Sequence, residues 1–218
     1  LDEMIHCGIN AALVEHNVAR EYDPVYGNNK LMTKLKAEQR LLPIWVVMPH
    51  QTDEMPPGPE LVEQMIENDV RAARMYPKSQ NYILNDATCG VLLGALEGEG
   101  ILLSIDFNQA TPEQLTDMCL AHPDLPVLIT GASWAQTRFL YPVLDQCPNT
   151  HIEFSTFQAN YAIERLGARY GFERLLFGTG ALMKSPGAAK SFIDYADIPD
   201  EERVKVAGGN LARLLRLQ

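Results

Sequence analysis

Short apolar runs recur along the chain and alternate with segments of helical hydrophobic spacing. These runs are rich in Val, Ile and Leu, which predicts strands at 11–15, 43–48, 70–76, 101–107, 126–130, 151–156 and 175–177. Between them, residues 61–68 and 89–99 carry apolar side chains at intervals of three and four, as amphipathic helices do. Residues 1–7 also read as a helix, and residues 185–196 begin with Ser185 as an N-cap and Pro186 at the first helical position.

Strand and helix alternate with a repeat of about 25 to 30 residues, which indicates βαβ units and a parallel sheet. An open doubly wound sheet could hold seven strands, but no Gly-rich nucleotide loop follows the first of them. A closed (β/α)8 barrel needs eight strands. We therefore predict an α/β fold, a TIM-like (β/α)8 barrel in one domain over residues 1–218, with seven strands visible and the first strand upstream of residue 1. A barrel without that strand would expose unpaired backbone groups, so we expect a longer native protein or another segment in the gap.

Composition narrows the classes of function. The chain is 46% hydrophobic and 21% charged, which is typical of a globular protein, and its formal charge of −10 without a Lys/Arg cluster argues against a nucleic-acid partner. No apolar run approaches the roughly 18 residues of a membrane span, and no basic-then-apolar leader opens the chain. Cys7, Cys89, Cys119 and Cys147 are far apart, so we expect reduced thiols rather than disulfides or a zinc site. We expect a cytoplasmic protein with a small-molecule substrate or ligand, and a homo-oligomer stays open.

Polar residues share one face at the end of the strand at 101–107. Residues 103, 105 and 107 are apolar and share the face that suits surrounding helices, so Asp106 and Asn108 should point into the barrel mouth. Asp106 is a candidate catalytic acid or base, with a structural hydrogen-bonding role as the alternative. Asn108 and the following Gln109 are candidates for substrate binding.

Arg74 and Tyr76 share one face near the end of the strand at 70–76. A guanidinium there could pair with Asp106 or hold a substrate carboxylate, and a purely structural ion pair is the alternative. Arg74 is therefore a candidate catalytic residue, and Tyr76 is a candidate for substrate binding.

Histidines also stand near strand ends. His50 follows the strand at 43–48 and could ligate a metal or carry a proton, with plain polar surface as the alternative. His16 ends the first strand and could likewise ligate a metal, carry a proton or be plain polar surface, but its functional role has weaker support. His6 and His122 are expected to have no function. Trp134 follows the strand at 126–130, where it could wall a substrate pocket or pack against a loop.

The apolar run at 175–177 stops abruptly at Gly178-Thr179-Gly180. Glycines there could permit a tight turn or leave space for a ligand, to which Thr179 could donate a hydrogen bond. Phosphate bound at a helix N-terminus is not supported, because the next helix begins only near Ser185.

Several stretches together resemble one family. They are VRAARMYP (70–77), IDFNQ (105–109), LAHPDLPVLITG (120–131), RFLYPVLDQCPN (138–149), ERLLFGTG (173–180) and IPDEERVKVAGGNLARLL (198–215). The chain resembles the amidohydrolase-related proteins, metal-dependent hydrolases and decarboxylases of TIM-barrel fold. In the last stretch, the acidic residues 200–202 suit a helix N-terminus, and we expect residues 208–209 to break the helix before Asn210 caps a final one.

The resemblance implies a divalent metal, often zinc, at the barrel mouth. Its ligands would be a His-x-His on the first strand, histidines on later strands and an aspartate that ends the eighth strand. This sequence departs from the pattern, because Gly180 stands where that aspartate is expected and Thr130 and Gly131 end the sixth strand in place of a histidine. The fifth strand likewise offers Asp106 and Asn108. The cofactor is therefore unknown, and zinc stays open only if the first strand supplies most ligands.

Three functions remain open. The first is a hydrolase or decarboxylase acting on a small carboxylate- or amide-bearing substrate, with Asp106 as acid or base, Arg74 as anion anchor and His50 as ligand or proton carrier. The second is a catalytically degenerate barrel that binds a small ligand or partner without metal, motivated by the acid missing at Gly180. The third is a metal-free lyase or isomerase that uses Asp106, Arg74 and Glu153.

Overall fold

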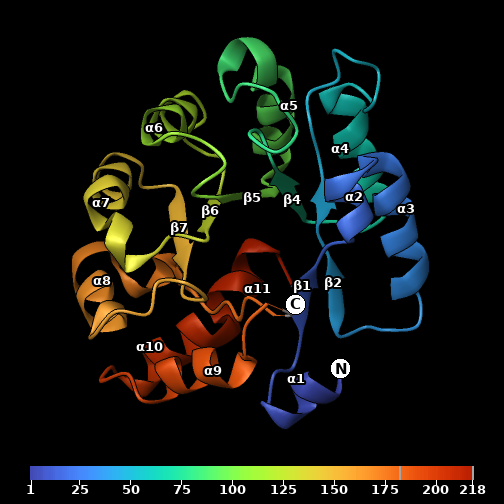
Figure 1. Cartoon of the computed structure of the whole chain (residues 1–218). Coiled ribbons are helices and arrows are strands. Elements are labelled where there is room, and N and C mark those ends of the chain that lie inside the picture. Colours follow the sequence, from blue (N-terminus) through green and yellow to red (C-terminus); the bar gives the residue numbers. More distant parts are fainter. Residues whose placement is uncertain (182, 218) are drawn as a thin grey trace.

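The computed structural model describes residues 1–181 and 183–217. All strand pairs in it are parallel, and they form two ladders, β1–β2 and β3–β4–β5–β6–β7–β8. The strands surround a common centre, as the sequence predicted (Figure 1). They are β1 (Ala12–Val14), β2 (Leu41–Pro43), β3 (Trp45–Val46), β4 (Ala72–Met75), β5 (Leu102–Asp106), β6 (Val127–Thr130), β7 (Thr150–Glu153) and β8 (Leu175–Leu176).

The expected strand at 43–48 is split in two by a bend. Pro43, which has no N–H to give to a ladder, ends β2, and the Ile44 N–H still donates to the Val14 carbonyl over 2.9 Å. The chain then turns, and the Val47 N–H donates to the Arg74 carbonyl over 2.9 Å. One bent segment therefore belongs to both ladders and joins β1 to the larger one. No ladder joins β8 to β1 within residues 1–181 and 183–217.

Most helices lie outside the strands, whereas the last one lies near the centre of the view (Figure 1). Capping residues in the sequence determine where several of the helices begin. Asp23 caps the helix that begins at Pro24, and Thr111 with Gln114 forms a capping box. The helices are α1 (Asp2–His6), α2 (Asn17–Glu21), α3 (Pro24–Leu35), α4 (Gly58–Glu67), α5 (Asp86–Glu99), α6 (Pro112–Ala121), α7 (Thr137–Gln146), α8 (Ala162–Tyr170), α9 (Pro186–Asp194), α10 (Asp200–Val204) and α11 (Asn210–Leu214), with short 3₁₀ turns η1 (Trp134–Gln136) and η2 (Phe172–Arg174). In the part of the chain that the structure describes, no helix combines the length and hydropathy needed to span a bilayer.

The two faces of the strands pack differently. Residues 103, 105 and 107 join the core between strands and helices, as their spacing predicted. Leu102 and Leu128 belong instead to a smaller inner cluster, which Leu214 and Leu215 complete from the chain end. Arg216 lies against Gly100, just before β5 begins, so the C-terminal segment covers the amino ends of the strands. The carboxyl ends of the strands form the opposite edge, called the mouth below.

The prediction that the helix breaks at residues 208–209 is wrong. The helix runs from α10 through one π-helical turn, Lys205–Gly209, into α11 without interruption, because the wider turn absorbs an extra residue. Asn210 is helical, and its buried side chain does not cap a new helix. It donates to the carbonyls of Phe172 over 2.8 Å and Leu175 over 2.9 Å, which ties the helix to the start of β8.

Replacing Asn210 by Ala should therefore lower the free energy of unfolding by about 2–3 kcal/mol, because two carbonyls lose their donor in the interior. Urea unfolding measures the change. Asn29→Ala, at an exposed position in α3, is the control and should change it by less than about 0.5 kcal/mol. If the two variants had equal free energies of unfolding, the two hydrogen bonds of Asn210 would not stabilise the fold.

Candidate functional site

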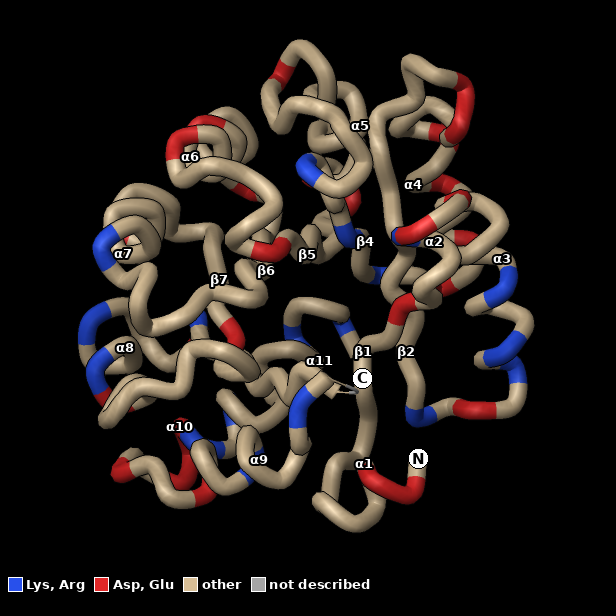
Figure 2. The backbone as a smooth tube through the Cα atoms, viewed as in Figure 1, with Lys and Arg blue, Asp and Glu red and all other residues tan. Residues whose placement is uncertain are grey.

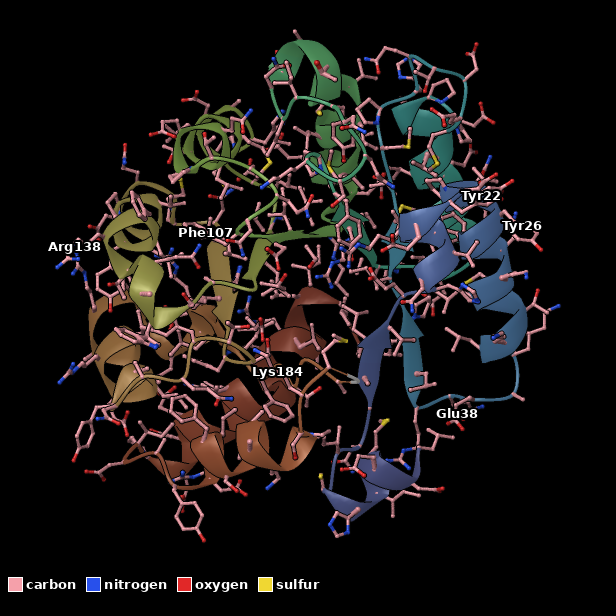
Figure 3. The ribbon with its side chains drawn as sticks, in the orientation of Figure 1. Tyr22, Tyr26, Glu38, Phe107, Arg138 and Lys184 are labelled. Carbon is pink, nitrogen blue, oxygen red and sulfur yellow. The ribbon has the colours of Figure 1, made fainter. Side chains whose placement is uncertain are left out.

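Charged side chains from distant parts of the chain gather at the mouth. Glu15 follows β1, Asp106 ends β5, Glu153 ends β7, and Arg74 lies near the end of β4. Lys184 enters from the segment after β8, and in Figure 3 it lies inside the ring of helices. We call these five residues the mouth cluster. Figure 2 shows acidic and basic segments at the strand ends as well as on the outer helices.

Arg74 contacts residues at the ends of two other strands, β1 and β6. Its Nη2 donates to Thr130 Oγ1 over 3.2 Å, and its Nε lies 3.7 Å from Glu15 Oε2. The structure thus pairs Arg74 with Glu15 and not with Asp106, one of the two partners that the sequence suggested. Thr130 is the ladder partner of Asp106, so the guanidinium crosses β5 and lies beside the strand end that carries this acid. About a quarter of the Arg74 side chain, 24%, is exposed and open to a ligand.

Tyr76 holds this ion pair in place. Its hydroxyl donates to Glu15 Oε1, and its ring centroid lies 4.8 Å from the guanidinium carbon of Arg20 and 5.3 Å from that of Arg74. Burial raises the pKa of Tyr76 far above its usual value, so the phenol stays a neutral donor. Tyr76 is only 2% exposed, which indicates a positioning role and not the substrate contact that the sequence suggested.

Asp106 has one fixed oxygen and one open oxygen. Oδ1 accepts hydrogen bonds from the Asn108 N–H over 2.8 Å and from Asn108 Nδ2 over 3.0 Å. A Cβ on Gly131 would come within 1.9 Å of Oδ2, so only glycine, here with φ +69°, lets the acid adopt this position. No residue that the structure describes donates to Oδ2, and Asn108 therefore orients the acid while leaving this oxygen to a ligand.

Glu153 is buried and fully bonded. Oε1 accepts from the Ser155 hydroxyl over 2.8 Å and from the Gly131 N–H over 3.2 Å, and Oε2 accepts from the Ser155 N–H over 2.6 Å. A Cβ on Gly178 would lie 1.9 Å from Oε2. The first glycine of Gly178-Thr179-Gly180 is thus required because the backbone passes directly over this carboxylate.

Lys184 is a residue that the sequence analysis missed. Its Nζ donates to the Ser155 carbonyl and to Thr156 Oγ1, each over 2.8 Å. A Cβ on Gly180 would lie 3.1 Å from Lys184 Cδ, so this side chain fills space near the position where the resemblance placed an aspartate. A single lysine in an irregular segment carries no periodic signal, and only the fold shows that it reaches the mouth.

The other substrate-binding candidates differ in their positions. Gln109 exchanges hydrogen bonds with Ser79, donating to its Oγ over 2.9 Å and accepting from its N–H over 3.0 Å, so it joins two loops. Trp134 stands on η1 with 63% of its surface exposed. Thr179 Oγ1 accepts from the Ala181 N–H over 3.2 Å, which leaves its hydroxyl proton free to donate.

The structure does not bring the histidines into the mouth cluster. His50 is half-buried in the loop after β3, and its ring makes no hydrogen bond or ion pair with the described part of the chain. His16 caps α2 by accepting from the Val18 N–H over 3.2 Å, and burial, with Lys34 and Lys30 adding to it, lowers its pKa. His122 is buried against Glu97, with Nδ1 3.0 Å from Oε2, and so has a structural role.

Surface grooves of about 510 Å³ and 420 Å³ lie on the outer helices, between α4 and α5 and between α8 and α9. Neither is lined by a residue of the mouth cluster. The candidate site is therefore identified by its charges and by strand geometry, and not by the size of a cavity.

Comparison with known proteins places the chain in a family. A profile of the amidohydrolase family matches residues 9–217. The chain belongs to the amidohydrolase family. No curated protein matches its sequence.

Several solved structures are similar to this one. An uncharacterised TIM-barrel protein from Bordetella bronchiseptica superposes with a TM-score of 0.80 at 18% identity, covering 99% of this chain and 80% of that one. For a 2,6-dihydroxybenzoate decarboxylase from Rhizobium the TM-score is 0.77 at 14% identity, covering 99% and 87%. For the 5-carboxyvanillate decarboxylase of Sphingomonas paucimobilis it is 0.75 at 14% identity, covering 100% and 82%. These likenesses establish the TIM-barrel fold.

The divalent metal that the family resemblance implies does not fit the residues present. Residues 1–181 and 183–217 contain no group of three or more His, Cys, Asp or Glu side chains placed to hold a metal ion. Glu153 already accepts three hydrogen bonds, and the cation of Lys184 lies beside its neighbour Ser155.

A buried histidine lies deeper on β7, two residues before Glu153. His151 is 7% exposed, and burial lowers its pKa from 6.5 to about 4. Between these values the unfolded chain binds more protons than the folded one, so the free energy of unfolding falls as the pH falls from 6.5 to 4, by up to about 3 kcal/mol.

His151→Gln should remove this part of the pH dependence. The free energy of unfolding in urea, measured at pH 7 and pH 4.5, should fall less in the variant than in the wild type. His6→Gln, at an exposed position in α1, is the control and should keep the wild-type difference. If the free energy of unfolding of His151→Gln fell between pH 7 and pH 4.5 as much as that of the wild type, His151 would not be the source of this pH dependence.

Gly178→Ala should destabilise the protein by about 1–3 kcal/mol, because the new methyl group overlaps Glu153 Oε2 and the end of β7 has to shift. Thermal unfolding checks this. Gly94→Ala is the matched control, since nothing lies within 4 Å of a Cβ there, and it should be neutral or stabilising. A Gly178→Ala variant as stable as the wild type would show that the carboxylate is not held in this way.

Proposed function

We propose that the protein acts on a small organic acid bound at the mouth, and that the reaction is decarboxylation. The observation that carries this proposal is the placement of Arg74, a partly exposed cation, beside the strand end where Asp106 presents an open oxygen. An anion-binding group and an adjacent proton carrier are what the loss of CO2 from a carboxylate and its replacement by a proton require. The decarboxylases among the similar structures support this choice.

In the proposed reaction, Arg74 binds and orients the substrate carboxylate through its guanidinium. The bond between this carboxylate and the neighbouring carbon breaks, CO2 leaves, and the electron pair stays on the substrate. The substrate must therefore carry a conjugated ring or carbonyl group that accommodates the pair. Asp106, as the carboxylic acid, donates its proton to the carbon and recovers one from water. Asn108 keeps the acid oriented through its two hydrogen bonds to Oδ1.

A second candidate is a barrel that binds a small acid without converting it. The departure from the family pattern at Gly180 and the absence of a metal-holding group from the described residues favour it. Product formation separates the two candidates, because both predict binding.

Asp106→Asn should lower turnover by at least about 100-fold while leaving the substrate Kd within about threefold, because the amide keeps the shape of the acid but carries no transferable proton. Small aromatic and β-keto acids are incubated with the protein, and CO2 and product are measured by mass spectrometry. Arg74→Met should raise the Kd about 10-fold or more. Asp117→Asn, exposed on α6, is the control.

Undiminished turnover in Asp106→Asn would contradict the assigned role. Hydrolysis products formed without CO2 would show that the reaction is hydrolysis and not decarboxylation. Tight binding that depends on Arg74 but gives no product from any acid would establish the second candidate.

A further inference from the structure

Lys184 is the cation of the mouth cluster that has no acidic partner. Its ammonium donates to two neutral oxygens, the Ser155 carbonyl and Thr156 Oγ1. No carboxylate in the described residues lies within salt-bridge distance of it, whereas Arg74 is paired with Glu15. A lysine ammonium has three donors, so one N–H is left for a ligand.

Lys184 is an exposed residue, but its ammonium is held by two hydrogen bonds. Gly180 has φ +62° and no side chain, and the aliphatic part of Lys184 lies over it, with Cδ 3.1 Å from the place of a Cβ. Ser155, which accepts from the ammonium, is itself held by the carboxylate of Glu153 through its N–H and its hydroxyl. These contacts restrict the ammonium, which lowers the entropic cost of ligand binding.

The two cations of the mouth are anchored at different points. Arg74 is bonded to Thr130 on β6, and Lys184 to Ser155, two residues beyond the end of β7. Ile129 pairs with Ile152, so Thr130 lies beside Glu153. Ser155 lies in a bend beyond the end of β7, so the two cations are bonded to different segments of the mouth. Each cation can therefore bind its own acid group, as a small molecule with two acid groups would provide.

We propose that Lys184 is a second anion-binding residue of the mouth, so that the site takes an acid with two negatively charged groups. This inference rests on the proposed function, in which Arg74 holds the carboxylate that reacts. Lys184 holds the group that does not react and so determines which acids bind.

The test compares isophthalate, with two carboxylates on one ring, and benzoate, with one, by calorimetric titration of the full chain. The wild type should bind isophthalate at least 10-fold more tightly than benzoate. Lys184→Met keeps the length of the side chain and removes the charge, and should weaken isophthalate binding at least 10-fold and benzoate binding less than twofold. Lys190→Met on α9, where the lysine pairs with Asp194, is the control and should change neither.

Equal weakening of both acids in Lys184→Met would overturn the inference, as would a wild type that binds the two acids equally. If Lys184→Met melts at a lower temperature than the wild type, Lys184→Gln is measured in its place. Two results together would overturn this inference and leave the proposed function intact. Arg74→Met would lose benzoate binding, and Lys184→Met would bind isophthalate as tightly as the wild type. If neither acid binds the wild type, both this inference and the proposed function fail.

Discussion

The carboxylate of Glu153 is the constraint on which the mouth depends. It is only 6% exposed, and a buried carboxylate without partners is strongly unfavourable. Its donors come from the segment after β6 and from its own strand, and the glycine backbone after β8 closes over it. The ends of three strands are therefore fixed relative to one another by a single side chain. The positions of Asp106 and Lys184 both follow from this arrangement.

The charges of the mouth are arranged so that each has a defined function. Glu153 is saturated and holds the scaffold, whereas Glu15 and Tyr76 hold Arg74. Asp106 keeps one oxygen open, and Lys184 keeps one donor open. Fixed dipoles and charges of this kind do not need to reorganise when a ligand arrives, which is a general source of binding strength and of catalysis.

The fold could be predicted from the sequence because it depends on periodicity. Each expected strand position contains a strand, and alternation correctly separated the outward residues of β5 from the inward Asp106. An ion pair of Arg74 was among the expectations, but its partners Glu15 and Thr130 could not be predicted, because a side chain that reaches past a neighbouring strand leaves no trace in local spacing. Lys184 lies in an irregular segment, where only the path of the backbone determines what it contacts. The glycines before Asn210 predicted a break, but a π turn accommodates the same residues within a continuous helix.

Gly131 has an acid on each side. The open oxygen of Asp106 lies over its α-carbon, and its N–H is bonded to Glu153. Any side chain at this position would displace the first acid, and any change of backbone conformation would withdraw a donor from the second. Residues 106, 131 and 153 therefore form one structural unit, in which a substitution at one position disturbs the other two.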